Sequence, residues 1–179
     1  VDPTMASPKN AKVAQYGDVL VNSLTKYASW AGDVMIGSLV FPDHSELGAE
    51  LFESTKNLAC PPFERDLLRL CEQLPLYTNF VKRTNHSLFQ VVDFLNSNPL
   101  IKKVYWAYQD GYSKSFQKIA GDEKAGCVVS FEVKGNFESF YNHLQMLKSP
   151  SFGTEFSLCC PYVYLAPVSY THLTLPTTK

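Results

Sequence analysis

Hydrophobic positions along this chain follow two spacings, which together predict a mixed α/β fold. Short apolar runs rich in β-branched residues predict strands at residues 19–21, 35–41, 101–107, 127–133 and 156–163. Apolar residues that recur every three or four positions predict helices at residues 44–56, 63–74, 78–96 and 136–147. We expect Pro75 to kink or end the second helix and Asn136 to cap the last. A short amphipathic helix is expected at 8–16, and the polar residues 113–124 predict a mobile connection.

The order of these elements predicts two parts. Residues 1–97 would form part of a large domain with long helices, and residues 98–166 part of a smaller C-terminal α/β domain. Residues 167–179 do not continue the pattern and resemble a translated adapter, so we treat them as an unrelated tail. Because the chain opens within a strand-like segment, we expect it to be a fragment.

Composition excludes several classes of function. The chain has 179 residues, 45% hydrophobic and 18% charged, which is typical of a soluble globular protein. A net charge of −1 without a basic cluster argues against nucleic acid or a membrane surface as partner. No apolar run approaches the roughly 18 residues of a membrane span, and no signal peptide opens the chain. Five cysteines without C-x-x-C spacing and four scattered histidines predict reduced thiols, a cytoplasmic location and no metal site.

Candidate chemistry follows the first predicted strand. Ser23, Thr25 and Lys26 lie where that strand should end, and ligands of open α/β sheets bind outside the carboxyl ends of strands. An amine beside anion-binding hydroxyls suits pyridoxal phosphate. Asp2 ends another strand-like segment, and a parallel arrangement with a helical crossover would bring it to the edge that carries Lys26. Trp30, close to Lys26, is a further candidate for the pocket wall.

Three segments resemble the Cys/Met-metabolism family of pyridoxal-phosphate enzymes. They read V-D-P-T-M-A-S-P from Val1, Y-G-D-V-L-V-N-S-L-T-K-Y from Tyr16 and D-V-M-I-G from Asp33. The resemblance continues to about Ala166, and the segment that begins at Ser151 (S-F-G-T) is most similar to the cystathionine γ-synthase branch. Residues 29–32 (S-W-A-G) depart from the usual N-G-H-S of the family.

This resemblance implies a fold and a site. The fold would be part of a fold-type-I, aspartate-aminotransferase-like α/β enzyme, with part of the large-domain sheet and a smaller C-terminal α/β layer. Lys26 would form the Schiff base with the cofactor, Asp2 would face the pyridine nitrogen, and Ser23 and Thr25 would hold the phosphate. Ser151 would lie near the substrate carboxylate.

The resemblance also implies a reaction, with alternatives. Cysteine and an acylated homoserine would give cystathionine, in a homo-oligomer that acts on small amino-acid substrates. A γ-lyase or homocysteine-forming relative shares the same residue pattern, and an inactive, truncated interaction domain is the alternative of another class. As a fragment, the chain is expected to present an open, solvated half-site without turnover of its own.

Overall fold

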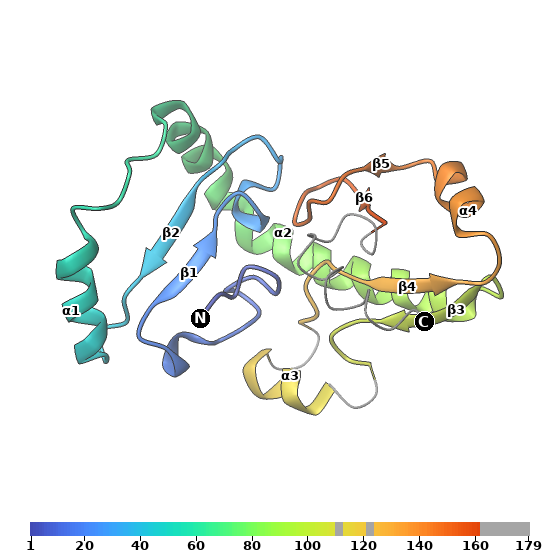
Figure 1. Ribbon diagram of the computed structural model, residues 1–179, viewed down its shortest axis with the longest axis horizontal. Helices are drawn as coiled ribbons and strands as arrows, with labels where there is room; N and C mark the ends of the chain where they lie inside the picture. The colour runs from blue at the N-terminus through green and yellow to red at the C-terminus, as the bar shows by residue number, and fades with distance from the viewer. Residues whose placement is uncertain (110–112, 121–123, 162–179) are drawn as a thin grey trace, which may run out of the picture.

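The computed structural model describes residues 1–109, 113–120 and 124–161, which form an α/β structure along one long helix. Strands β1 (Leu20–Ser23) and β2 (Gly37–Val40) and helix α1 (Glu46–Thr55) precede α2 (Glu64–Ser97). The later elements are β3 (Ile101–Tyr105), α3 (Ser113–Ala120), β4 (Ser130–Val133), α4 (Phe137–His143), β5 (Leu147–Lys148) and β6 (Leu158–Cys159). Figure 1 shows β1, β2 and α1 at one end of the molecule and β3, β4 and α4 at the other, with α2 reaching the second group.

The described strands form three two-stranded sheets: β1–β2, β3–β4 and β5–β6. The first two pairs are antiparallel and the third is parallel. The segment at Val1 bonds to β1 in the parallel manner, since its amino group donates to the Val19 carbonyl (2.8 Å) and its carbonyl accepts from the Val21 amide (2.9 Å). The helix expected at residues 8–16 is reduced to the 3₁₀ turn Ala14–Tyr16.

Helix α2 differs from the two helices expected in this region. It runs for 34 residues and contains Pro75, so the proline does not end it. Proline removes one backbone hydrogen bond, but Pro75 is exposed and its ring does not interrupt the packed face of the helix. That face continues on both sides of it, with Leu70 before and Phe80, Leu88 and Val92 after. Burial of one continuous apolar stripe therefore keeps the helix intact.

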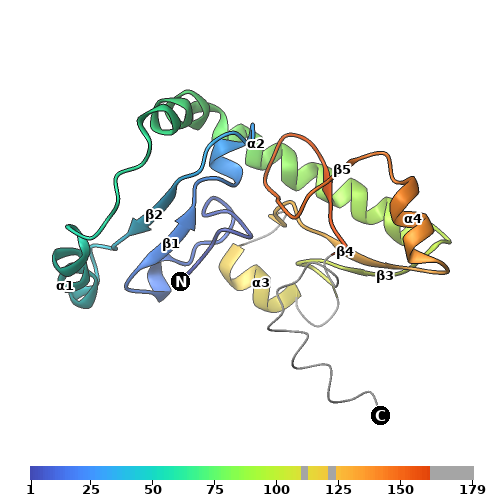
Figure 2. The ribbon, with the colours of Figure 1, turned by 45° about the horizontal axis from the view of Figure 1, so that its top comes forward.

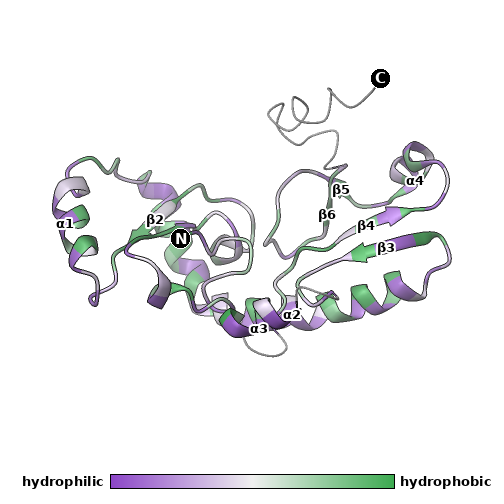
Figure 3. Ribbon diagram, turned by 60° about the horizontal axis from the view of Figure 1, so that its bottom comes forward, coloured by the Kyte–Doolittle hydropathy of each residue, from purple (hydrophilic) through white to green (hydrophobic). Residues whose placement is uncertain are grey.

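Three of the small hydrophobic clusters of the described residues lie along α2. Leu70 packs with Ala28 and Val34, whereas Phe80 and Val81 pack with Tyr27. Further along, Leu88 and Val92 pack beside Ala125 and the β3–β4 ribbon. The alternation of hydrophobic and hydrophilic residues along α2 is visible in Figure 3, and Figure 2 shows the helix passing beside both groups of strands. The helix thus connects the Lys26 region to the second half of the chain.

Two other local predictions have clear outcomes. Asn136 caps α4 as expected, since its side chain accepts from the Ser139 amide at 2.7 Å. The expectation of a mobile connection at 113–124 is wrong for residues 113–120, which form α3. The rings of Phe116 and Tyr108 meet edge-on, with their centres 5.5 Å apart. Ile119 packs against the cluster of Ala11, Val13 and Leu20. Apolar contacts with other segments therefore fix one face of this polar helix.

The end of the chain is described only in part. The strand expected at 156–163 is present as Leu158–Cys159, and residues beyond 161, including the tail assigned to 167–179, lie outside the described residues. Across the residues that the structure describes, no helix has the length and apolar character needed to cross a bilayer.

Candidate active site around Lys26

The turn that carries Lys26 begins where β1 ends and is fixed by backbone hydrogen bonds. The amides of Leu24 and Thr25 both donate to the Ile36 carbonyl, at 2.9 and 3.2 Å. Lys26 then caps the 3₁₀ turn Tyr27–Ser29, whose last amide donates back to the Lys26 carbonyl at 2.8 Å. Because Ile36 immediately precedes β2, pairing of β1 with β2 sets the position of the Lys26 backbone.

Two candidate residues from opposite ends of the chain meet in this structure. The Lys26 ammonium Nζ donates to the Ser151 hydroxyl Oγ at 2.8 Å, across a separation of 125 positions. The same Nζ lies 5.1 Å from the centre of the Phe152 ring, within the range of a cation–π contact. Lys26, Ser151 and Phe152 are all half-buried, and among the described residues the amine has one hydroxyl partner and one aromatic neighbour.

Gly153 allows this close approach. Its φ of +75° lies in the left-handed region, and a Cβ at this position would lie 2.6 Å from the Tyr27 amide nitrogen. Only glycine fits both conditions without a shift of the backbone. The loop after Ser151 is therefore seated directly on the backbone of the residue that follows Lys26.

Tyr27 holds the same turn through hydrogen bonds of its side chain to two other segments of the chain. Its buried hydroxyl donates to the Met5 carbonyl (2.9 Å) and accepts from the Cys127 amide (3.0 Å). Burial raises the pKa of Tyr27 far above its usual range, and burial likewise raises the pKa of the Cys127 thiol. The phenol and the thiol are thus neutral groups near the site, and Tyr27 has a packing and tethering role.

Asp2 and Ser23 lie on adjoining segments. Thr4 joins them, because its hydroxyl accepts from the Ser23 amide at 2.9 Å while its amide donates to the Asp2 carboxylate at 2.9 Å. Asp2 is exposed, and among the described residues it forms no ion pair with Lys26. The segment that carries Asp2 is therefore fastened to the end of β1 through one threonine.

The Thr25 hydroxyl bonds to the neighbouring backbone. It accepts from the Ile36 amide at 3.1 Å and reaches the Ile36 carbonyl at the long distance of 3.5 Å. The second contact is weak, so the hydroxyl proton could be redirected to an anion while the first bond is kept.

The residue patterns missed two side chains that shape the site. Thr4 belongs to the V-D-P-T segment, yet no role was predicted for it. Gln73 is 1% exposed on α2 and binds the loop after Lys26. A signal for Gln73 was present, since it lies three positions after Leu70 on the apolar face of the helix, where a polar residue needs partners.

Comparison with known proteins places this chain in a family. The model of the Cys/Met metabolism PLP-dependent enzymes matches residues 1–179. The chain belongs to this family. Pyridoxal 5'-phosphate is the cofactor of these enzymes, as the resemblance of the sequence implied.

Similar proteins of this family carry out different reactions. The chain is 30% identical to the L-2-amino-4-chloropent-4-enoate dechlorinase/desaturase of Streptantibioticus cattleyicolor, over 93% of this chain and 33% of that protein. It is 27% identical to the cystathionine gamma-synthase of Neurospora crassa, over 93% of this chain and 27% of that protein. It is 30% identical to the L-methionine gamma-lyase of Fusobacterium nucleatum, over 83% of this chain and 38% of that protein. The chain spans about a third of the length of these relatives.

Solved structures confirm the fold class. Cystathionine gamma-lyase from Lactobacillus plantarum, complexed with L-serine, superposes with a TM-score of 0.82 at 20% identity, over 99% of this chain and 48% of that one. Cystathionine gamma synthase from Xanthomonas oryzae superposes with a TM-score of 0.74 at 22% identity, over 97% of this chain and 44% of that one. The chain is thus an α/β portion of the fold of these enzymes.

The residues present suit the family's cofactor in their chemistry. A half-buried amine, two hydroxyls at the end of β1 and a nearby carboxylate are the groups that a phosphorylated pyridine aldehyde needs. The second contact of Thr25 is long, so its hydroxyl proton is available to another acceptor. Lys26 and Ser151 are in direct contact, and Asp2 is linked to Ser23 through Thr4.

Proposed function

We propose that the protein containing this chain is a pyridoxal-phosphate enzyme of γ-substitution type, which forms cystathionine from cysteine and an acylated homoserine. The observation that carries the proposal is the 2.8 Å contact between Lys26 Nζ and Ser151 Oγ. It joins the lysine of the S-x-T-K-Y motif to the segment most similar to the cystathionine γ-synthase branch. Because the chain spans about a third of the curated relatives, the proposal concerns the whole protein.

Each side chain has a proposed role. Lys26 holds the cofactor covalently through its amine, Ser23 and Thr25 donate to its phosphate, and Asp2 keeps the pyridine nitrogen protonated. Bound in this way, the cofactor supplies an electron sink for the substrate's α-carbon chemistry.

The protein groups then bind the substrate and move its protons. Ser151 would bind the substrate carboxylate next to the amine, and its 2.8 Å contact with Lys26 Nζ supports this role. The Lys26 amine would carry protons between substrate carbons. In the overall substitution, the Cγ–O bond of the acylated homoserine breaks and the carboxylate leaves. The Cγ–S bond to cysteine forms, and the thiol gives up its proton.

A γ-lyase reaction is the second candidate. It is favoured by the 30% identity to the Fusobacterium methionine gamma-lyase. Elimination differs from substitution only after the γ-substituent has left, because water rather than a thiol completes the reaction. We further propose a homo-oligomer acting on small amino acids; a cytoplasmic location stays a prediction.

Two measurements test the proposal. Borohydride reduction of the protein loaded with pyridoxal phosphate, followed by peptide mapping, should find the cofactor on Lys26, and Lys26→Ala should abolish this adduct. A reducible adduct that persists in Lys26→Ala would refute the assignment.

Steady-state assays of the protein at its natural length should show cystathionine formation faster than cystathionine breakdown. Dominant release of ammonia and 2-oxobutyrate would establish the lyase reaction instead, and absence of cofactor binding would favour the interaction-domain alternative.

A further inference from the structure

Gln73 connects α2 to the loop that follows Lys26. Its side-chain oxygen accepts from the Ala31 amide at 3.1 Å, and its side-chain nitrogen donates to Asp33 Oδ1 at 2.7 Å. The other oxygen of Asp33 accepts from Arg69 Nε at 2.7 Å, one helical turn before Gln73. A fully buried amide that uses both ends on one short loop holds that loop in one place, because either end left unpaired would cost free energy.

Trp30 extends this connection to the loop of Ser151. Its indole Nε1 donates to the Gln73 carbonyl at 3.1 Å, and its own carbonyl accepts from the Glu155 amide at 2.8 Å. The Trp30 ring also packs in the cluster that contains Phe80 and Phe152. We use the name "brace" for Gln73, Trp30 and the backbone of Ala31 and Glu155.

The brace ends beside the reactive amine. Gly32, in the same loop, has a φ of +76°, and a Cβ there would lie 3.2 Å from the Thr154 methyl group. Residues 30–32 are therefore packed against residues 154–155, which immediately follow the segment that presents Ser151 and Phe152 to Lys26. A continuous path of hydrogen bonds and contacts runs from α2 through the brace to the partners of Lys26.

We propose that Trp30 and Gln73 are positioning residues that fix the loop of Ser151 over the Lys26 amine. The inference rests on the proposed function, since it assigns these residues a purpose in cofactor attachment. Trp30 and Ala31 of the brace lie within the segment 29–32, where this sequence departs from the usual N-G-H-S of its family. Neither residue is itself a catalytic group.

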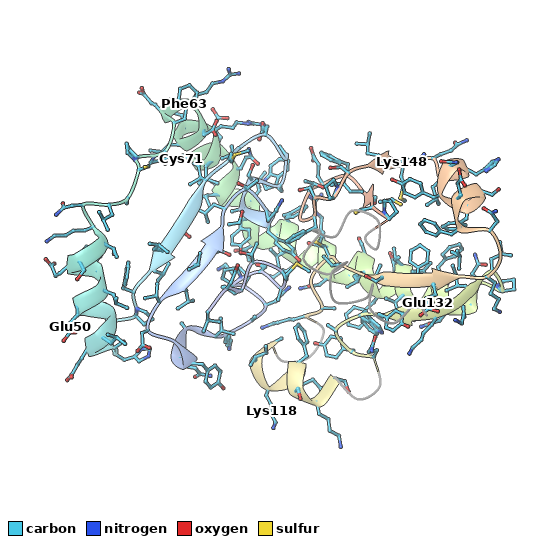
Figure 4. The ribbon with its side chains drawn as sticks, in the orientation of Figure 1. Glu50, Phe63, Cys71, Lys118, Glu132 and Lys148 are labelled. Atoms are coloured by element: carbon cyan, nitrogen blue, oxygen red, sulfur yellow. The ribbon has the colours of Figure 1, made fainter. Side chains whose placement is uncertain are left out.

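The test measures attachment of pyridoxal phosphate to Lys26 without relying on turnover. The protein is incubated with limiting pyridoxal phosphate and borohydride, and peptide mass spectrometry compares the adduct on Lys26 with that on Lys118. Lys118 is an exposed residue of α3 that points outward in Figure 4, and so serves as an internal reference. Gln73→Met removes both amide hydrogen bonds with little change in size, and Gln90→Met on the exposed side of α2 is the matched control.

A double-mutant cycle separates positioning from loss of stability. Gln73→Met should lower the Lys26 to Lys118 ratio roughly 3- to 10-fold, because ångström-scale misplacement of a reacting group costs up to about a hundredfold. In a Ser151→Ala background, the same substitution should have little further effect, because the partner that the brace positions is gone. Gln90→Met should leave the ratio unchanged in both backgrounds.

Each outcome has one meaning. An unchanged ratio in folded Gln73→Met, or an equal fall in both backgrounds, overturns the positioning role. If Gln73→Met does not fold, Trp30→Phe removes only the indole donor. It should give a smaller fall in the Lys26 to Lys118 ratio, again only when Ser151 is present. Trp106→Phe is the control for this variant. A wild-type protein that labels Lys26 no faster than Lys118 would instead refute the proposed function.

Discussion

Replacing Gly153 with alanine tests how closely the loop of Ser151 is seated on the turn of Lys26. The φ of +75° at this position costs an alanine about 1–2 kcal/mol. The new Cβ would also lie 2.6 Å from the Tyr27 amide nitrogen, a backbone atom that cannot move aside easily. Relief of such a clash typically costs a further 1–3 kcal/mol or so. Together the two effects predict a loss of about 2–5 kcal/mol in the free energy of unfolding.

Gly135 provides the matched control for this prediction. Its φ of +85° is similar, but nothing lies within 4 Å of a Cβ built there. Gly135→Ala should therefore lose only the backbone part, about 1–2 kcal/mol. Urea unfolding followed by circular dichroism measures both variants under the same conditions. Equal losses in the two would refute the close seating of Gly153 on Tyr27, whereas an excess loss in Gly153→Ala supports it.

Three further substitutions give independent checks. Ser29 has a fully buried hydroxyl with no partner among the described residues, so Ser29→Ala should raise the free energy of unfolding by about 1 kcal/mol; a loss would point to an unseen partner. The Arg69 guanidinium lowers the pKa of Asp33. The wild-type protein should therefore be more stable than Asp33→Asn by a constant amount near neutral pH, and this difference should vanish as the pH falls below about 4. Urea unfolding midpoints measured across this pH range test the prediction. The raised pKa of Tyr27 means that its phenol should ionise only on unfolding, and its stabilising effect should fall as pH rises above about 10. Tyr27→Phe removes two hydrogen bonds and should lower the free energy of unfolding by about 1–3 kcal/mol. The ultraviolet absorbance of this variant should lack one tyrosine that titrates at high pH. A titration curve that the substitution leaves unchanged contradicts the burial of Tyr27.

Local patterns in the sequence predicted most of the elements near the site. The β-branched run before Ser23 forms β1, the period of apolar residues after His44 forms α1, and Asn136 caps α4. These features depend on neighbours within a few positions, so the residues themselves contain the information. The prediction failed at Pro75, where packing of one face of α2 on both sides of the proline outweighs its local effect, and at residues 113–120, where tertiary contacts hold a polar helix.

The sequence by itself determined the family, through the segments around Asp2, Lys26 and Ser151, because those motifs are contiguous and their residue types carry the chemistry. Only the tertiary structure decided that Lys26 Nζ meets Ser151 Oγ, that Gly153 packs on Tyr27, and that Gln73 holds the loop of Trp30. Each of these contacts joins residues more than 40 positions apart. Their geometry depends on how α2 and the two loops pack together, and no periodicity in a single segment records that.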